Sequence, residues 1–114
     1  MDETDMDLGG NIKLVGFKEI SKAELVVVKK LVGSYARKLG DNLHEFQELK
    51  VTLKPVHKTT NSEKFELHAG VRSVHDHVEA EVIERNLFVG LDAVLQKVSE
   101  HAFRDVEKQE KYNN

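Results

Sequence analysis

Residues 86–111 read NLFVGLDAVLQKVSEHAFRDVEKQEK and form the longest clearly periodic segment of this sequence. Apolar residues recur in it at steps of three and four, which is the spacing of one face of a helix. This apolar stripe consists of Phe88, Leu91, Leu95, Val98 and Ala102, widened by Leu87, Val94 and Phe103. Another face is mostly basic and carries Lys97, His101, Arg104, Lys108 and Lys111. The segment predicts a helix whose apolar side needs a sheet to cover, and whose basic side is either solvated or meets an anion.

The composition indicates one soluble domain. The chain has 114 residues, of which 39% are hydrophobic and 32% are charged, as in globular proteins with a heavily solvated surface. It has no apolar run near the roughly 20 residues of a membrane span. Cysteine is absent, which excludes a disulfide framework, a thiolate nucleophile and a cysteine-based zinc site. We expect a cytoplasmic protein, because the first ten residues also lack the basic and apolar regions of a secretory signal.

The net charge of −3 hides an uneven distribution. Residues 1–10 contain four acidic residues and no basic one, so the rest of the chain has 17 basic and 20 − 4 = 16 acidic residues, a balance of +1. We interpret residues 1–10 as a disordered acidic tail that ends in the hinge Gly9-Gly10. Basic residues gathered on particular elements bear on an anionic partner more than the total charge does.

A strand and a helix are predicted after the tail. Residues 11–18 form the strand, with Leu14 on one side and Phe17 on the other. Ser21 and Glu24 then make a capping box, in which each side chain accepts a hydrogen bond from the backbone N–H of the other. Gly40 stands where helices commonly end in a left-handed conformation, so we expect this helix to end there. Its apolar stripe is Leu25, Val28, Val32, Tyr35 and Leu39.

Three further strands are predicted from strict alternation, over residues 47–55, 64–71 and 77–83. Pro55 is expected to close the first of them, with turns over residues 57–62 and 73–76. The inward apolar set is Leu49, Val51, Leu53, Phe65, Leu67, Ala69, Val71, Val78, Ala80 and Val82. The order β-α-β-β-β-α predicts an α+β two-layer sandwich, a four-stranded sheet with two helices packed on one face. We expect one domain over residues 11–108 and a frayed end over residues 109–114.

This order and the last helix resemble the family of the ribosome hibernation-promoting factor and ribosome-associated inhibitor A, also known as sigma modulation proteins. The resemblance covers residues 11–108 and is to the short form of the family. It is carried by residues 77–81 (HVEAE) and 86–98 (NLFVGLDAVLQKV), and by YARKL at the end of the first helix. Leu87-Phe88 stands where the family usually has Met-Tyr, and Lys97-Val98 where it has Lys-Leu. Beyond Lys97 the family's denser Lys/Arg run is diluted here by acidic and aromatic residues.

The resemblance implies a protein that docks on the small ribosomal subunit where mRNA and tRNA bind, and that blocks translation while it preserves idle ribosomes. Basic residues of both helices would contact the rRNA backbone; no DNA or membrane partner is expected. The candidates carried over by position are Lys29, Lys30, Arg37, Lys38, Lys97, Arg104 and Lys108. Lys22 and His101 join them because they extend the same basic rows, Lys22 being seven residues before Lys29.

Two alternatives remain open from the residues themselves. The basic faces are also explained as solvated helix surfaces supported by i,i+4 pairs such as Glu100 with Arg104. The alternative function is a non-enzymatic protein-interaction module that uses the polar face of the sheet, with its mixed charges, or a sheet edge.

Catalysis and metal binding are not predicted. The sequence contains no G-x-S-x-G motif and no glycine-rich phosphate loop, so we expect no enzyme and no cofactor. Among the six His, His68 and His77 could approach each other across a hairpin, with Glu79 or Glu81 nearby. A metal site requires three or four ligands at short, fixed distances, and exposed His is common without one, so we assign no metal ligands.

Overall fold

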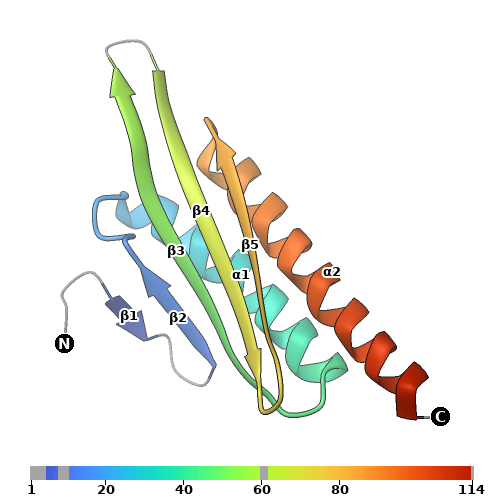
Figure 1. Cartoon of the computed structure of the whole chain (residues 1–114). Helices are drawn as coiled ribbons and strands as arrows, with labels where there is room; N and C mark the ends of the chain where they lie inside the picture. Colours follow the sequence, from blue (N-terminus) through green and yellow to red (C-terminus); the bar gives the residue numbers. More distant parts are fainter. Residues whose placement is uncertain (1–4, 8–10, 60–61, 114) are drawn as a thin grey trace.

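The computed structural model describes the backbone of residues 5–7, 11–59 and 62–113, and the side-chain surroundings of residues 11–54 and 64–104. One sheet, in the order β1-β2-β3-β4-β5, is covered on a single face by the helices α1 and α2 (Figure 1). The elements are β1 (Asp5–Asp7), β2 (Ile12–Val15), α1 (Lys22–Asn42), β3 (Phe46–Thr59), β4 (Ser62–Ser73), β5 (His77–Glu84) and α2 (Leu87–Asn113). The predicted α+β sandwich and its order β-α-β-β-β-α are confirmed from β2 onward.

The strand β1 was not predicted. It pairs antiparallel with β2, so that Met6 lies opposite Leu14, and it adds a fifth strand at the edge of the sheet. Residues 5–7 belong to the stretch that the sequence predicts as a disordered acidic tail; the rest of that tail lies outside the described residues. At the other end of the chain, α2 continues past Lys108 to Asn113.

The helix α1 makes the one crossover of the described sheet. It connects β2 to the parallel strand β3, whereas β3, β4 and β5 follow one another as an antiparallel meander (Figure 1). A parallel pair needs such a crossover, because a tight turn can join only antiparallel strands. No helix in the part of the chain that the structure describes is long and apolar enough to cross a membrane.

The core lies between the sheet and the two helices, as the alternation predicted. Leu49, Val51 and Leu67 are fully buried on the inner face, and the α2 stripe from Leu91 to Val98 packs against the same cluster. The side chains that alternate with them, such as Lys50 and Lys54, are exposed on the outer face. One wet face and one covered face are typical of antiparallel strands.

The first predicted strand is shorter than expected, because Gly16 turns the chain. Gly16 has φ 84°, in the region that favours glycine, and a Cβ there would lie 2.2 Å from the backbone oxygen of Leu53. The strand β2 ends at Val15, and Phe17 is fully buried in the same core as Leu14. The prediction that these two side chains lie on opposite sides of a strand was therefore wrong.

The capping box of α1 is confirmed, but its predicted end is wrong. The Glu24 backbone N–H donates to Ser21 Oγ at 3.1 Å, and the Ser21 N–H donates to Glu24 Oε1 at 3.2 Å. The helix runs through Gly40 to Asn42, and the backbone N–H of the buried Leu43 donates to the Leu39 carbonyl oxygen at 2.8 Å. The longer helix brings Leu43 into the core. Glycine is common just after a helix, but here the helix continues through Gly40 because the burial of Leu43 favours the extra turn.

Pro55 does not close its strand, because β3 continues to Thr59. The register of β3 against β4 shifts between Pro55 and His57, which is a bulge-like irregularity. On the other side of β3, β2 pairs only up to Thr52, so Pro55 stands where β3 has become an edge. Proline is tolerated at edges and bulges because its missing N–H is not needed there. The predicted turn over residues 57–62 was wrong for residues 57–59, which belong to β3, and for Ser62, which begins β4; residues 60–61 lie outside the described residues.

Replacing Gly16 and Gly33 by alanine should have opposite effects on stability. Gly16→Ala forces a left-handed backbone and a contact with the Leu53 carbonyl, and should lower the free energy of unfolding by about 2–3 kcal/mol. Gly33→Ala adds a methyl group inside α1 with no atom within 4 Å, and should raise it by about 0.5–1 kcal/mol. Urea unfolding of both variants measures this; equal effects would contradict the described turn.

Candidate nucleic-acid interface

The basic residues of α1 are all exposed, but they lie on different sides of the helix. Lys30 is two residues after the buried Val28, and Arg37 is two residues before the buried Leu39. Because successive residues turn by about 100°, positions two apart point in roughly opposite directions. Lys30 and Arg37 therefore point away from the sheet into solvent.

A hydrogen bond between the helices shows which flank of α1 faces α2. The Tyr35 hydroxyl donates to Asp92 Oδ1 at 3.0 Å. Lys38, three residues after Tyr35, shares that flank, because positions three and four apart are neighbours on a helix surface. Lys22 and Lys29 are seven residues apart and lie on the opposite flank of α1, away from α2.

The basic row of α2 begins on the side of that helix next to β5. Lys97 Nζ donates to the backbone carbonyl oxygen of Glu81, in β5, at 3.3 Å. Arg104 Nη2 lies 3.9 Å from Glu100 Oε2, four residues earlier, in an exposed pair of the kind that contributes little to stability. His101 is partly buried between these two positions. Lys108 belongs to α2, but its side chain lies outside the described residues.

The two basic rows are therefore not side by side. Lys22 and Lys29 occupy the flank of α1 away from α2, and Lys97 occupies the flank of α2 away from α1. The seam between the helices carries the carboxylate of Asp92, and Glu100 is close enough to act electrostatically on Tyr35. The outer surface of the two helices therefore has acidic side chains in its middle, with Lys30, Arg37 and Lys38 on one side and Arg104 on the other.

The contact between the two helices also raises the pKa of Tyr35. Burial is the largest cause that raises the pKa of this phenol above its ordinary value of 10.0. The hydrogen bond to Asp92 and the negative charges of Asp92 and Glu100 raise the pKa further, because each favours the protonated phenol. The Tyr35 hydroxyl therefore stays a hydrogen-bond donor over the physiological range, which holds Asp92 at the seam.

The outer face of the sheet carries the mixed-charge pairs that the alternation predicted. Arg72 Nη2 lies 3.6 Å from Glu48 Oε2 across β4 and β3, and His77 Nε2 lies 3.0 Å from Glu79 Oε1 within β5. A shallow hollow of about 190 Å³ lies over Gly70, and no Phe or Tyr lines it. Among the described residues, the lining of this hollow therefore offers no aromatic platform of the kind on which single-stranded RNA stacks.

The sequence allows His68 and His77 to approach each other across the hairpin, with Glu79 or Glu81 nearby, and the structure pairs each His with carboxylates. His77 pairs with Glu79, whereas His68 lies between Glu66 and Glu81, with nitrogen–oxygen distances of 3.5 and 3.6 Å. Glu66 was not connected with His68 from the sequence, although their i,i+2 spacing on one strand face is a signal that could have found the pair.

Known structures share this fold. A ribosomal subunit interface protein from Coxiella burnetii matches with a TM-score of 0.59 and 13% sequence identity, over 85% of this chain and 96% of that chain. The N-terminal domain of Protein Y from Thermus thermophilus matches with a TM-score of 0.57 and 19% identity, over 87% and 98%. No protein-family model matches the sequence, and no curated protein matches it significantly. The resemblance seen in the sequence is thus confirmed at the level of the fold.

Removing the seam hydrogen bond should change how stability depends on pH. The raised pKa of Tyr35 means that the folded chain keeps this proton to higher pH than the unfolded chain does. The resulting stabilisation is complete below pH 10.0 and is lost as the pH rises through the raised pKa. Tyr35→Phe should abolish this alkaline loss and should lower the free energy of unfolding at neutral pH by at most about 1 kcal/mol.

Urea unfolding as a function of pH measures the change in stability. Ultraviolet titration of tyrosinate in a Tyr112→Phe background measures the pKa of Tyr35 itself, because Tyr35 is then the only tyrosine. Asp92→Asn should bring the Tyr35 pKa down towards its ordinary value, whereas Asp41→Asn, at an exposed position on α1, should not. An unchanged titration in Asp92→Asn would show that the seam contact does not act on Tyr35.

Proposed function

We propose that this chain is a cytoplasmic, ribosome-associated stasis factor that binds small-subunit rRNA through basic residues of α1 and α2 and so blocks translation. The observation that carries the proposal is the set of exposed Lys and Arg residues on the outer surface of both helices, in a fold shared with a ribosomal subunit interface protein. The protein would act by occupying its site on the ribosome and not by chemistry.

The outward residues suit a phosphate backbone. Lys30 and Arg37 lie two helical turns apart, about 10 Å along the axis at 1.5 Å per residue, and neither faces the sheet. Their long side chains can therefore reach successive phosphates of one strand. Contacts of this kind release counterions, so the affinity should fall steeply as the salt concentration rises.

The acidic seam would orient the RNA and not simply weaken its binding. Phosphates are repelled by Asp92 and Glu100, and they are attracted to the basic residues on either side of the seam. A backbone that followed either basic row would avoid the carboxylates. Phosphate contacts of this kind set the position and orientation of a protein on a nucleic acid, without reading its sequence.

Charge reversal on both helices should abolish ribosome association. In the variant Lys30→Glu/Arg37→Glu/Lys97→Glu/Arg104→Glu, every changed residue is exposed in the structure. Co-sedimentation with ribosomes at low salt should be lost. Single Lys→Gln or Arg→Gln variants should lower the slope of log affinity against log salt by about 0.7–0.9 for each phosphate contact removed.

Lys50→Glu/Lys54→Glu, on the outer face of the sheet, is the matched control and should sediment like the unchanged protein. Retained sedimentation of the helix variant would refute the proposed interface. The alternative, an interaction module on the sheet, would be supported by a different result. The chain would then bind a protein with little dependence on salt, and Lys50→Glu/Lys54→Glu would lose that binding while the helix variant kept it.

Removing an acid from the helix surface should have the opposite effect. Glu100→Gln releases Arg104 from its 3.9 Å pair and removes a negative charge near the seam. Ribosome affinity at low salt should rise a few-fold, and the gain should disappear at high salt because exposed charges are screened there. Glu48→Gln, on the other face, should leave the affinity unchanged. A lower ribosome affinity of Glu100→Gln at low salt would contradict an RNA-binding surface next to Glu100.

A further inference from the structure

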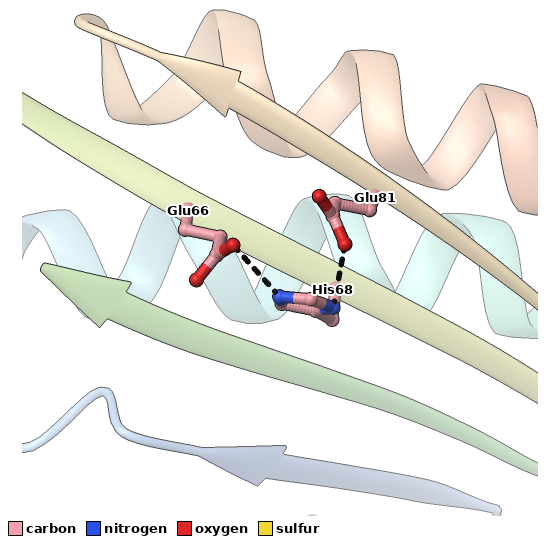
Figure 2. Close-up of side chains that lie close together, drawn as sticks. All are labelled: Glu66, His68 and Glu81. Carbon is pink, nitrogen blue, oxygen red and sulfur yellow. Dashed lines mark ion pairs between the residues drawn. The ribbon is translucent and has the colours of Figure 1, made fainter. Parts of the chain in front are cut away.

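Three side chains with metal-binding groups gather on the outer face of the sheet, opposite the helices. Glu66 and His68 are two residues apart on β4, so both project from the same face. Glu81 is the residue of β5 directly opposite His68 in the register. Figure 2 shows the two carboxylates approaching the imidazole ring of His68 from different sides. The paired backbones of β4 and β5 therefore hold the three residues in place.

The distances are close to those that a metal requires. His68 Nε2 lies 3.5 Å from Glu66 Oε1, and His68 Nδ1 lies 3.6 Å from Glu81 Oε2. One ligand atom from each residue can be chosen so that all three lie within 4.8 Å of one another. Around a tetrahedral zinc ion with bonds of about 2.1 Å, neighbouring ligand atoms are about 3.4 Å apart. Binding an ion therefore requires side-chain rotations that bring both carboxylates to one ring nitrogen of His68.

When His68 is neutral, the cluster leaves one of its ring nitrogens facing a carboxylate with no proton between them. Ionised carboxylates only accept hydrogen bonds, and a neutral imidazole has one donor nitrogen and one acceptor nitrogen. With carboxylates on both sides, the acceptor nitrogen of a neutral His68 faces another acceptor. Nε2 is shielded from solvent and has no hydrogen-bond partner among the described residues. Its 3.5 Å approach to Glu66 is too long for a good hydrogen bond.

We propose that Glu66, His68 and Glu81 bind a divalent first-row metal ion, Zn²⁺ in the first place, with water completing the coordination. One imidazole and two carboxylates are ligands that zinc accepts, whereas Mg²⁺ prefers oxygen ligands alone. One ion takes a single ring nitrogen, so one carboxylate has to turn towards it. The Glu81 side chain is 56% exposed and has room to do so.

The neighbouring strand places a threonine and a lysine beside the site. On β3, Thr52 lies opposite His68 and the exposed Lys54 lies opposite Glu66. A metal ion would therefore have to bind Glu66 in the presence of a lysine on the next strand. A bound ion would cross-link β4 to β5 and would neutralise acidic charge on this face. The site is independent of the proposed rRNA contacts, which lie on the helices.

Isothermal titration of the untagged full chain with zinc chloride tests the proposal. We expect one Zn²⁺ per chain, no comparable binding of Mg²⁺, and at least about tenfold weaker zinc binding in Glu66→Gln, His68→Gln and Glu81→Gln. The matched control is His77→Gln, because His77 lies on the same face, 3.0 Å from a single carboxylate, that of Glu79. This control should bind zinc like the unchanged protein.

Nuclear magnetic resonance of the unchanged chain gives a second measurement that does not depend on the variants folding. Zinc should shift the imidazole signals of His68 and leave those of His75 and His77 in place. Absence of saturable zinc binding, retention of binding in His68→Gln, or equal losses in His77→Gln and the cluster variants would each overturn the proposal. In those cases the cluster is only an ion-pair arrangement across the strands.

Discussion

Burial of the apolar stripe of α2 against β4 and β5 is the contact on which the rest of the arrangement depends. Gly90, in the first turn of α2, lies so close to the sheet that a Cβ there would come within 2.8 Å of Leu67 Cδ1 and 2.9 Å of Glu84 Cβ. A side chain larger than hydrogen at this position would therefore push the first turn of the helix away from the sheet. In the observed packing, Lys97 reaches β5 and Asp92 reaches α1.

The same one-sided packing separates two kinds of chemistry. The outer surface of the helices presents Lys and Arg residues to solvent, which suits a polyanion. The uncovered face of the sheet presents His and Glu side chains close to one another, within a strand and across strands, which suits a cation. The open face of the sheet follows from the alternation of its strands, and the outer surface of the helices follows from their period of 3.6 residues. The two proposed sites can therefore be tested and altered independently.

The seam between α1 and α2 shows how a contact between helices shapes a charged surface. Asp92 lies in the segment 86–98 that carries the family resemblance, and its carboxylate accepts a hydrogen bond from Tyr35. It anchors one helix to the other and places a negative charge between two basic rows. Counting Lys and Arg on each helix could not reveal this, because the count does not say which flanks meet.

The sequence by itself determined the elements whose causes are local. The capping box of α1 joins residues three apart, and the alternation of β3 to β5 and the stripe of α2 are read within a few residues, so these predictions were confirmed. Only the tertiary structure decided features that join distant residues. Phe17 turns into the core because Gly16 passes the Leu53 carbonyl, and Pro55 stays in its strand because β2 has already ended beside it. Tyr35 and Asp92 meet across the helices, because the packing of the core places their backbones side by side. Such pairs have no spacing rule, since the chain between them can take many lengths.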